Sequence, residues 1–144
     1  HIPYLYNYAG APWKTQQRTR FLLETWFQDN IFGNPGDEDG GAMGAWVVLT
    51  SLGLYQVTPG IPVFTITSPI FTAATIDLPA GKTFTVSAPA ADKRHKYIQS
   101  ATLNDEPLDS PFITYSQIMA GGKLTLELAE KPNRTWGTGG FPTP

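Results

Sequence analysis

The chain has 144 residues, enough for one ordinary domain that buries roughly two-thirds of the surface exposed by its unfolded form. Its net charge is −2 and only 15% of its residues are charged, which excludes the basic surfaces typical of nucleic-acid and membrane-surface binding. The absence of cysteine excludes disulfides and thiol sites. The chain begins at His1, within an apolar helical pattern and without methionine, so we expect a fragment whose true N-terminus lies elsewhere.

Residues 1–56 have a helical pattern. Apolar residues with helical spacing run from Ile2 to Tyr8, and Gly10 ends this first segment. A second helix is predicted over about residues 15–29, since its apolar residues gather on one side and its polar residues on the other. The apolar side consists of Phe21, Leu22, Trp26 and Phe27, and the polar side of Arg18, Arg20, Glu24 and Gln28.

A turn rich in glycine, proline and acidic residues, 34–41, separates the second helix from a third. The third helix, predicted from about Ala42 to Leu54, is apolar all round, which is typical of a helix that is buried on every side or crosses a membrane. It is too short to cross a bilayer, because a spanning helix needs about 20 residues. Two preceding helices cannot cover it, so more helices are implied than the chain contains.

Residues 57–132 change to alternating patterns typical of strands. Turn residues at 79–82 and 104–107 favour antiparallel hairpins, and Thr114 is a candidate cap for a short helix. Residues 133–144, rich in proline and glycine, are expected to be a peripheral tail. The fold class is therefore α+β. The candidate strands are 62–67, 74–78, 83–88, 97–103 and 123–128.

The acidic turn is the strongest candidate for chemistry. Asp37, Glu38 and Asp39 lie between glycines, immediately before the third helix. One interpretation is helix capping, since an acidic side chain satisfies free N–H groups at a helix start. The other is a catalytic or metal-binding cluster, because three adjacent acids exceed what a cap needs and glycines allow close approach of a ligand. The two histidines, His1 and His95, are too few and too far apart for a zinc motif.

Several blocks of the sequence resemble the α-mannosidases of glycoside hydrolase family 92. Residues 1–10, HIPYLYNYAG, are one such block, and residues 35–41, PGDEDGG, are another. Further similar blocks are SPIF at 68–71, YIQSATLN at 97–104 and GGKL at 121–124. The resemblance runs in order along nearly the whole chain. It implies that residues 1–56 are the last helices of an (α/α)6 barrel and that residues 57–132 are a C-terminal antiparallel β segment.

The resemblance also implies an activity: removal of terminal α-linked mannose with inversion by an exo-acting, calcium-dependent enzyme, with an α-1,2 linkage expected. Inversion requires an acid and a base on opposite faces of the sugar. The family's base is carried over to Asp39, with Asp37 as its partner or as an alternative base. The general acid is a glutamate upstream of this chain. The resemblance assigns His1 and Glu38 to substrate binding, with His1 near the leaving sugar, and it assigns no calcium ligand to a residue of this chain.

The expected partners are mannose-containing glycans, including N-glycans, and the remainder of the same polypeptide, with no nucleic acid and no membrane. The expected location is secreted, periplasmic or on the surface of a bacterium. Two alternatives remain open on the residues alone. The β half would permit a non-catalytic carbohydrate-binding module, and the whole chain would permit a structural cap that only stabilises a barrel.

Overall fold

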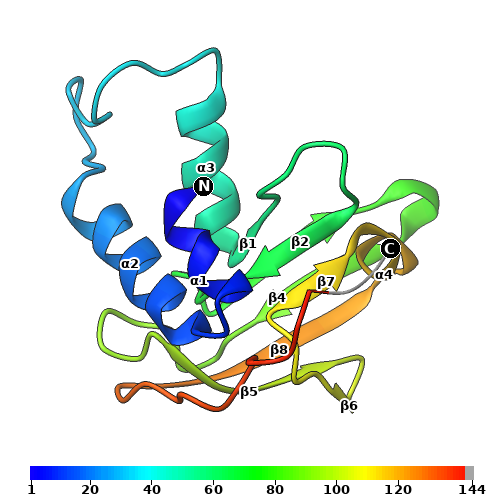
Figure 1. Ribbon diagram of the computed structural model, residues 1–144. Helices are drawn as coiled ribbons and strands as arrows, with labels where there is room; N and C mark the ends of the chain where they lie inside the picture. Colours follow the sequence, from blue (N-terminus) through cyan, green and yellow to red (C-terminus); the bar gives the residue numbers. More distant parts are fainter. Residues whose placement is uncertain (142–144) are drawn as a thin grey trace.

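The structure, a computed structural model, describes residues 1–141 and shows a helical half followed by a β half, which confirms the predicted α+β class (Figure 1). The helical half holds a 3₁₀ turn (Ile2–Tyr4), α1 (Leu5–Tyr8), α2 (Pro12–Thr25) and α3 (Ala42–Leu52). The β half holds β1 (Leu54–Tyr55), β2 (Val63–Ile66), β3 (Ala73–Asp77), β4 (Thr83–Ser87), β5 (Tyr97–Leu103), β6 (Glu106–Pro107), β7 (Phe112–Thr114), α4 (Tyr115–Ala120) and β8 (Gly122–Ala129). None of the helices described is long and apolar enough to cross a membrane.

The β half contains two sheets. The smaller has the order β1-β2-β7 and is antiparallel, and the larger has the order β3-β4-β8-β5-β6. The hairpins predicted from the turns at 79–82 and 104–107 are present as the pairs β3–β4 and β5–β6. The expectation of a wholly antiparallel segment is wrong, because β8 lies parallel to β4. Turn residues specify pairing only between strands adjacent in sequence, and β8 reaches its place between β4 and β5 after α4.

The main hydrophobic core lies in the β half and is built on the central strands. Phe84, Ile98, Leu124 and Leu126 are all 0% exposed. The segment that we expected to be peripheral contributes to this core, since Trp136 is 5% exposed and its indole N–H donates to the carbonyl of Leu108 over 2.9 Å. Residues 142–144 of that segment lie outside the described residues.

Buried polar side chains join the helices to the β half. The side-chain amide of Asn7 on α1 donates to the carbonyl of Ile66 over 3.1 Å, and the side-chain oxygen Oε1 of Gln16 on α2 accepts from the backbone N–H of Ile98 over 3.0 Å. Arg20, 2% exposed, donates to the carbonyls of Pro69 and Asp92 over 2.7 and 2.6 Å. Such bonds place α1 and α2 firmly on the sheets, because breaking any one leaves a buried polar group without its partner.

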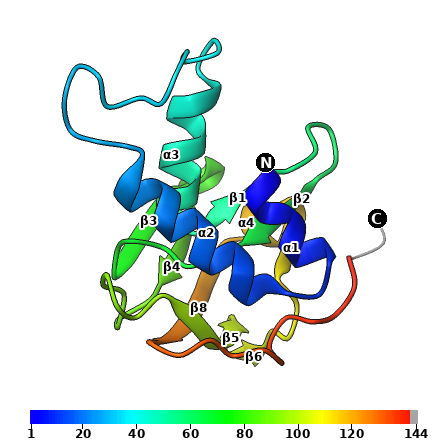
Figure 2. The ribbon, with the colours of Figure 1, turned by 60° about the vertical axis from the view of Figure 1, so that its left-hand side comes forward.

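The face of α2 that packs on the β half is its polar one. Apart from Pro12, its buried residues are all polar, whereas Phe21 is 48% and Trp26 is 54% exposed. Arg20, from the polar side of the helix, is only 2% exposed. The apolar side of α2 therefore faces away from the β half, as do Ile2 on the 3₁₀ turn and Val48 on α3, which are 71% and 58% exposed. Figure 2 shows these three helices gathered on one side of the β half, with the loop 26–41 extending beyond them.

This outward apolar surface predicts association of the isolated chain. Exposed contiguous apolar surface on a folded domain normally marks an interface or an aggregation hazard. We therefore expect the purified 144-residue chain to self-associate and to bind a dye specific for apolar surface, as measured by light scattering and fluorescence. A compact monomer that binds no dye would contradict the expectation that further helices cover α2 and α3.

Candidate functional site

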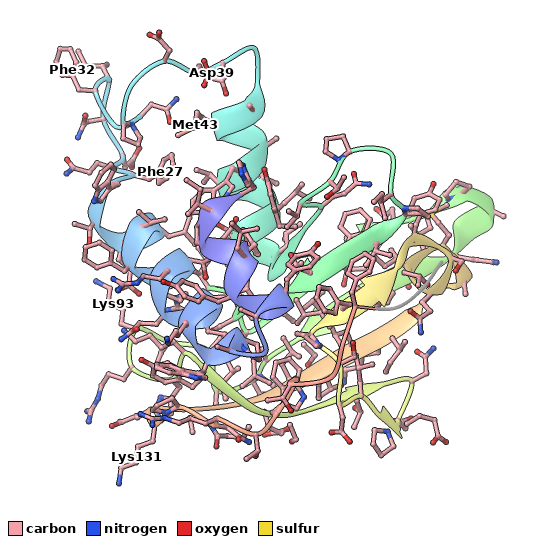
Figure 3. All side chains as sticks on the ribbon, viewed as in Figure 1. Phe27, Phe32, Asp39, Met43, Lys93 and Lys131 are labelled. Carbon is pink, nitrogen blue, oxygen red and sulfur yellow. The ribbon has the colours of Figure 1, made fainter. Side chains whose placement is uncertain are left out.

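The acidic turn lies in the loop between α2 and α3, at the end of α3 remote from the β half (Figure 3). Asp37, Glu38 and Asp39 are all exposed. The turn depends on left-handed backbone, with positive φ at Gly36, Gly40 and Gly41 and also at Asp39, where φ is 58°. A residue with a side chain rarely adopts this conformation, although aspartate tolerates it better than most. The glycines flanking the acids are thus a conformational requirement of the turn.

The capping role that the sequence left open belongs to Glu38. One of its carboxylate oxygens accepts from the backbone N–H of Gly41, and the other accepts from the N–H of Gly44 over 2.8 Å. These are N–H groups at the start of α3, which have no partner within the helix. Among residues 1–141, the carboxylates of Asp37 and Asp39 make no hydrogen bond and no ion pair. One acid is therefore used by the helix, and two remain free for chemistry.

An apolar pocket of about 280 Å³ lies beside the acidic turn, between the chain start, the end of α2 and the first turns of α3. Phe27 stacks on Trp46 with 5.3 Å between ring centroids and an interplanar angle of 20°. Met43, on the first turn of α3, lies between Asp39 and Phe27 in Figure 3. The pocket is lined by His1, Ile2, Pro3, Leu22, Trp26, Phe27, Pro35, Met43 and Trp46.

His1 is brought to this pocket, and the pocket reaches the acidic turn through Pro35 and Met43. No hydrogen bond or ion pair joins His1 to the three acids within the part of the chain that the structure describes. The sequence analysis did not single out Phe27, Met43 or Trp46 as lining residues of a site. The available signal was the concentration of aromatic residues on both sides of the acidic turn.

The residues described do not form a calcium site by themselves. Calcium takes six to eight oxygen ligands. Within residues 1–141 no group of three or more metal-binding side chains comes together, and both carboxylate oxygens of Glu38 are taken by backbone N–H groups. Residues 1–141 therefore do not by themselves supply a complete set of ligands for the calcium ion that the resemblance implies.

Comparison with known sequences identifies related proteins. The model of the family described as glycosyl hydrolase family 92 catalytic domain matches residues 1–130. An uncharacterized secreted glycosidase of Arthroderma benhamiae is 38% identical over 139 residues, which cover 94% of this chain and 18% of that protein.

Solved structures agree in fold along nearly the whole chain. A family 92 inverting mannosidase of Bacteroides thetaiotaomicron matches with a TM-score of 0.91 and 39% identity, over 96% of this chain and 19% of the other. A family 92 α-mannosidase of the same organism, in complex with mannoimidazole, matches with a TM-score of 0.91 and 29% identity, over 96% of this chain and 18% of the other. The chain thus spans about a fifth of the length of the relatives it matches.

Proposed function

The chain belongs to glycoside hydrolase family 92, and we propose that it is the C-terminal part of an enzyme that releases terminal α-linked mannose with inversion. The observation that carries this proposal is the family match over residues 1–130, which includes the acidic turn and the pocket beside it. Relatives of known structure are described as mannosidases, one of them as inverting. The proposed substrate is a terminal mannose of an N-glycan, attached through an α-1,2 linkage.

Asp39 is proposed as the general base, with Asp37 as its partner or as an alternative base. A base in an inverting glycosidase takes a proton from the water that attacks the anomeric carbon, while an acid protonates the leaving oxygen. The two carboxyl groups stand roughly 6.5–9.5 Å apart to leave room for that water. The free carboxylates of Asp37 and Asp39 suit the role of base. The acid is proposed to be a glutamate in the part of the enzyme outside this chain.

His1 and the apolar pocket are proposed to contribute to the subsite for the leaving sugar. Aromatic rings such as Trp26 and Phe27 offer apolar faces on which sugar C–H groups pack, and His1 brings a polar group to the same cavity. The lining of the pocket by Pro35, within the acidic turn, and by Met43, just after it, supports this role, because the leaving sugar occupies the position adjacent to the reacting bond.

The helices of residues 1–56 are proposed to be the last helices of an (α/α)6 barrel, with residues 57–132 completing the C-terminus. The apolar residues that α2 and α3 expose support this arrangement, since neighbouring helices would cover them. The remainder of the polypeptide is then a necessary partner, and any calcium ion would draw its ligands from there. A secreted, periplasmic or cell-surface location in a bacterium is proposed, and the Arthroderma benhamiae relative described as secreted supports export from the cell.

A separate carbohydrate-binding module in the β half is disfavoured by the contacts between the halves. Asn7, Gln16 and Arg20 each use buried hydrogen bonds to hold the helices on the β half. An independent module would have a surface adapted to water at this place. In this chain, removing the helices would instead expose the backbone groups of Ile66, Ile98 and Pro69, which are paired with the helices. Glycan binding by residues 57–132 alone would revive the module interpretation.

The proposed reaction can be tested through the stereochemistry of its product. We expect the full-length enzyme to hydrolyse para-nitrophenyl α-mannoside and to release β-mannose first, because single displacement by water inverts the anomeric carbon. Proton NMR spectra recorded in the first minutes distinguish the anomers before they equilibrate. Initial release of α-mannose would contradict inversion, and absence of hydrolysis of every α-mannoside tested would contradict the proposed function.

A further inference from the structure

Glu38 is the residue that ties the acidic turn to α3. Its carboxylate accepts from the N–H groups of Gly41 and Gly44, and its own carbonyl accepts from the N–H of Met43 over 3.1 Å. Because both oxygens of its carboxylate accept backbone N–H groups, we propose that Glu38 is a positioning residue that holds the Asp39 base in place, instead of taking the substrate-binding role that the resemblance implies. The inference rests on the proposed function, since it concerns the placement of the proposed base.

The bonds of Glu38 close a ring around Asp39. In the chain, Asp39 lies between Glu38, whose side chain accepts the hydrogen bond, and Gly41, whose N–H donates it. The carbonyl of Asp39 in turn accepts from the N–H of Ala42 over 3.3 Å. With Glu38 before it and Gly41 after it joined by a hydrogen bond at the start of α3, the backbone of Asp39 is held at a φ of 58°, a conformation that a residue with a side chain seldom adopts unaided.

Gly44 makes room for this ring. A Cβ added at Gly44 would lie 3.1 Å from the Glu38 Oε1 atom, closer than ordinary van der Waals contact. Gly44 lies inside α3, where alanine favours the helix more than glycine does. The glycine therefore lowers the stability of the helix, but it leaves the space that the Glu38 carboxylate needs to approach the backbone of α3. The same carboxylate stands at the positive end of the α3 dipole, which strengthens its hold on the N–H groups.

A simple helix cap and a positioning residue predict different consequences for turnover. Loss of a cap lowers stability but leaves the folded enzyme fully active. Loss of a positioning contact lets the base move, and displacement of a catalytic group by a fraction of an ångström lowers the rate of the chemical step more than it weakens substrate binding. The useful measurements are therefore kcat and KM, compared with melting temperature in the same preparations.

The decisive variant is Glu38→Gln in the full-length enzyme. The glutamine oxygen can accept from one N–H, but its amide group then faces the other N–H as a second donor. We expect kcat on para-nitrophenyl α-mannoside to fall about tenfold with KM nearly unchanged. Hydrogen exchange measured by mass spectrometry on a peptide spanning residues 38–46 is expected to accelerate, because the N–H groups of Gly41 and Gly44 lose protection.

A matched control comes from the capping box of α4, far from the acidic turn. The Thr114 hydroxyl accepts from the N–H of Gln117, and the Gln117 side chain accepts from the N–H of Thr114. Thr114→Ala removes a helix cap of the same kind and should lower the melting temperature while leaving kcat unchanged. A second variant, Gly44→Ala, crowds Glu38 while favouring the helix, so we expect kcat to fall by a smaller factor without loss of melting temperature.

The outcomes separate the positioning role from its alternatives. If Glu38→Gln and Gly44→Ala both keep the kcat of the wild type, as Thr114→Ala does, Glu38 is only a cap and the inference is overturned. If Asp39→Asn keeps full turnover, the assignment of the base fails, and the positioning role fails with it for that separate reason. A tenfold loss of kcat in Glu38→Gln alongside unchanged kcat in Thr114→Ala supports the inference.

Discussion

Replacement of Asp39 by asparagine in the full-length enzyme is expected to lower turnover by at least about a hundredfold. The amide cannot accept a proton from the attacking water, and general base assistance is typically worth roughly 10²–10⁴-fold. Substrate binding should survive better than turnover, because the carboxylate acts mainly in the transition state. Steady-state kinetics on para-nitrophenyl α-mannoside, with kcat and KM determined separately, measure both effects.

The stability of the same Asp39→Asn preparation provides the control. A helix cap at Asp39 would predict a loss of about 1 kcal/mol with near-normal turnover in the folded fraction. Because Glu38 already supplies the capping bonds, we expect Asp39→Asn to change the melting temperature little. Asp37→Asn is expected to lower turnover comparably if both acids share the water. A destabilised but fully active Asp39→Asn enzyme would contradict the assignment of Asp39 as the general base.

The isolated 144-residue chain is expected to have no detectable mannosidase activity. It would carry a base without an acid to protonate the leaving oxygen, and loss of one such group typically costs roughly 10²–10⁴-fold. The chain also spans only about a fifth of its relatives, so most of the substrate contacts would be missing as well. Incubation with para-nitrophenyl α-mannoside and calcium, followed by absorbance of the released phenolate, measures the activity.

The full-length enzyme under identical conditions is the positive control for that measurement. Adding back the separately produced upstream part would show whether the two pieces reassemble a working site. Turnover by the isolated chain at an appreciable fraction of the intact rate would show that residues 1–144 contain a complete site. Both the assignment of an external acid and the proposal of an incomplete barrel would then have to be abandoned.

The local features of this chain were readable from its residues. Gly10 predicted where the first helical segment ends, because glycine readily adopts positive φ. The second helix begins earlier than the predicted residue 15, at Pro12, because proline favours the first helical position. The turns at 79–82 and 104–107 predicted the two hairpins correctly, because glycine, asparagine and aspartate tolerate the positive φ that tight turns require. The three adjacent acids between glycines also indicated a special turn before α3.

The tertiary structure decided features that depend on what lies far away in sequence. Hydrophobic periodicity identifies two faces of α2 but not which one meets the β half. Burial of Arg20 is offset by the carbonyls of Pro69 and Asp92 and by the Glu24 carboxylate, which accept its N–H groups. The parallel pairing of β4 with β8 likewise joins strands that no turn connects. The different roles of the three acids in the turn are likewise decided by the tertiary structure. Which of three carboxylates reaches the free N–H groups of α3 depends on the path of the backbone, and only at Glu38 does that path bring the side chain to Gly41 and Gly44.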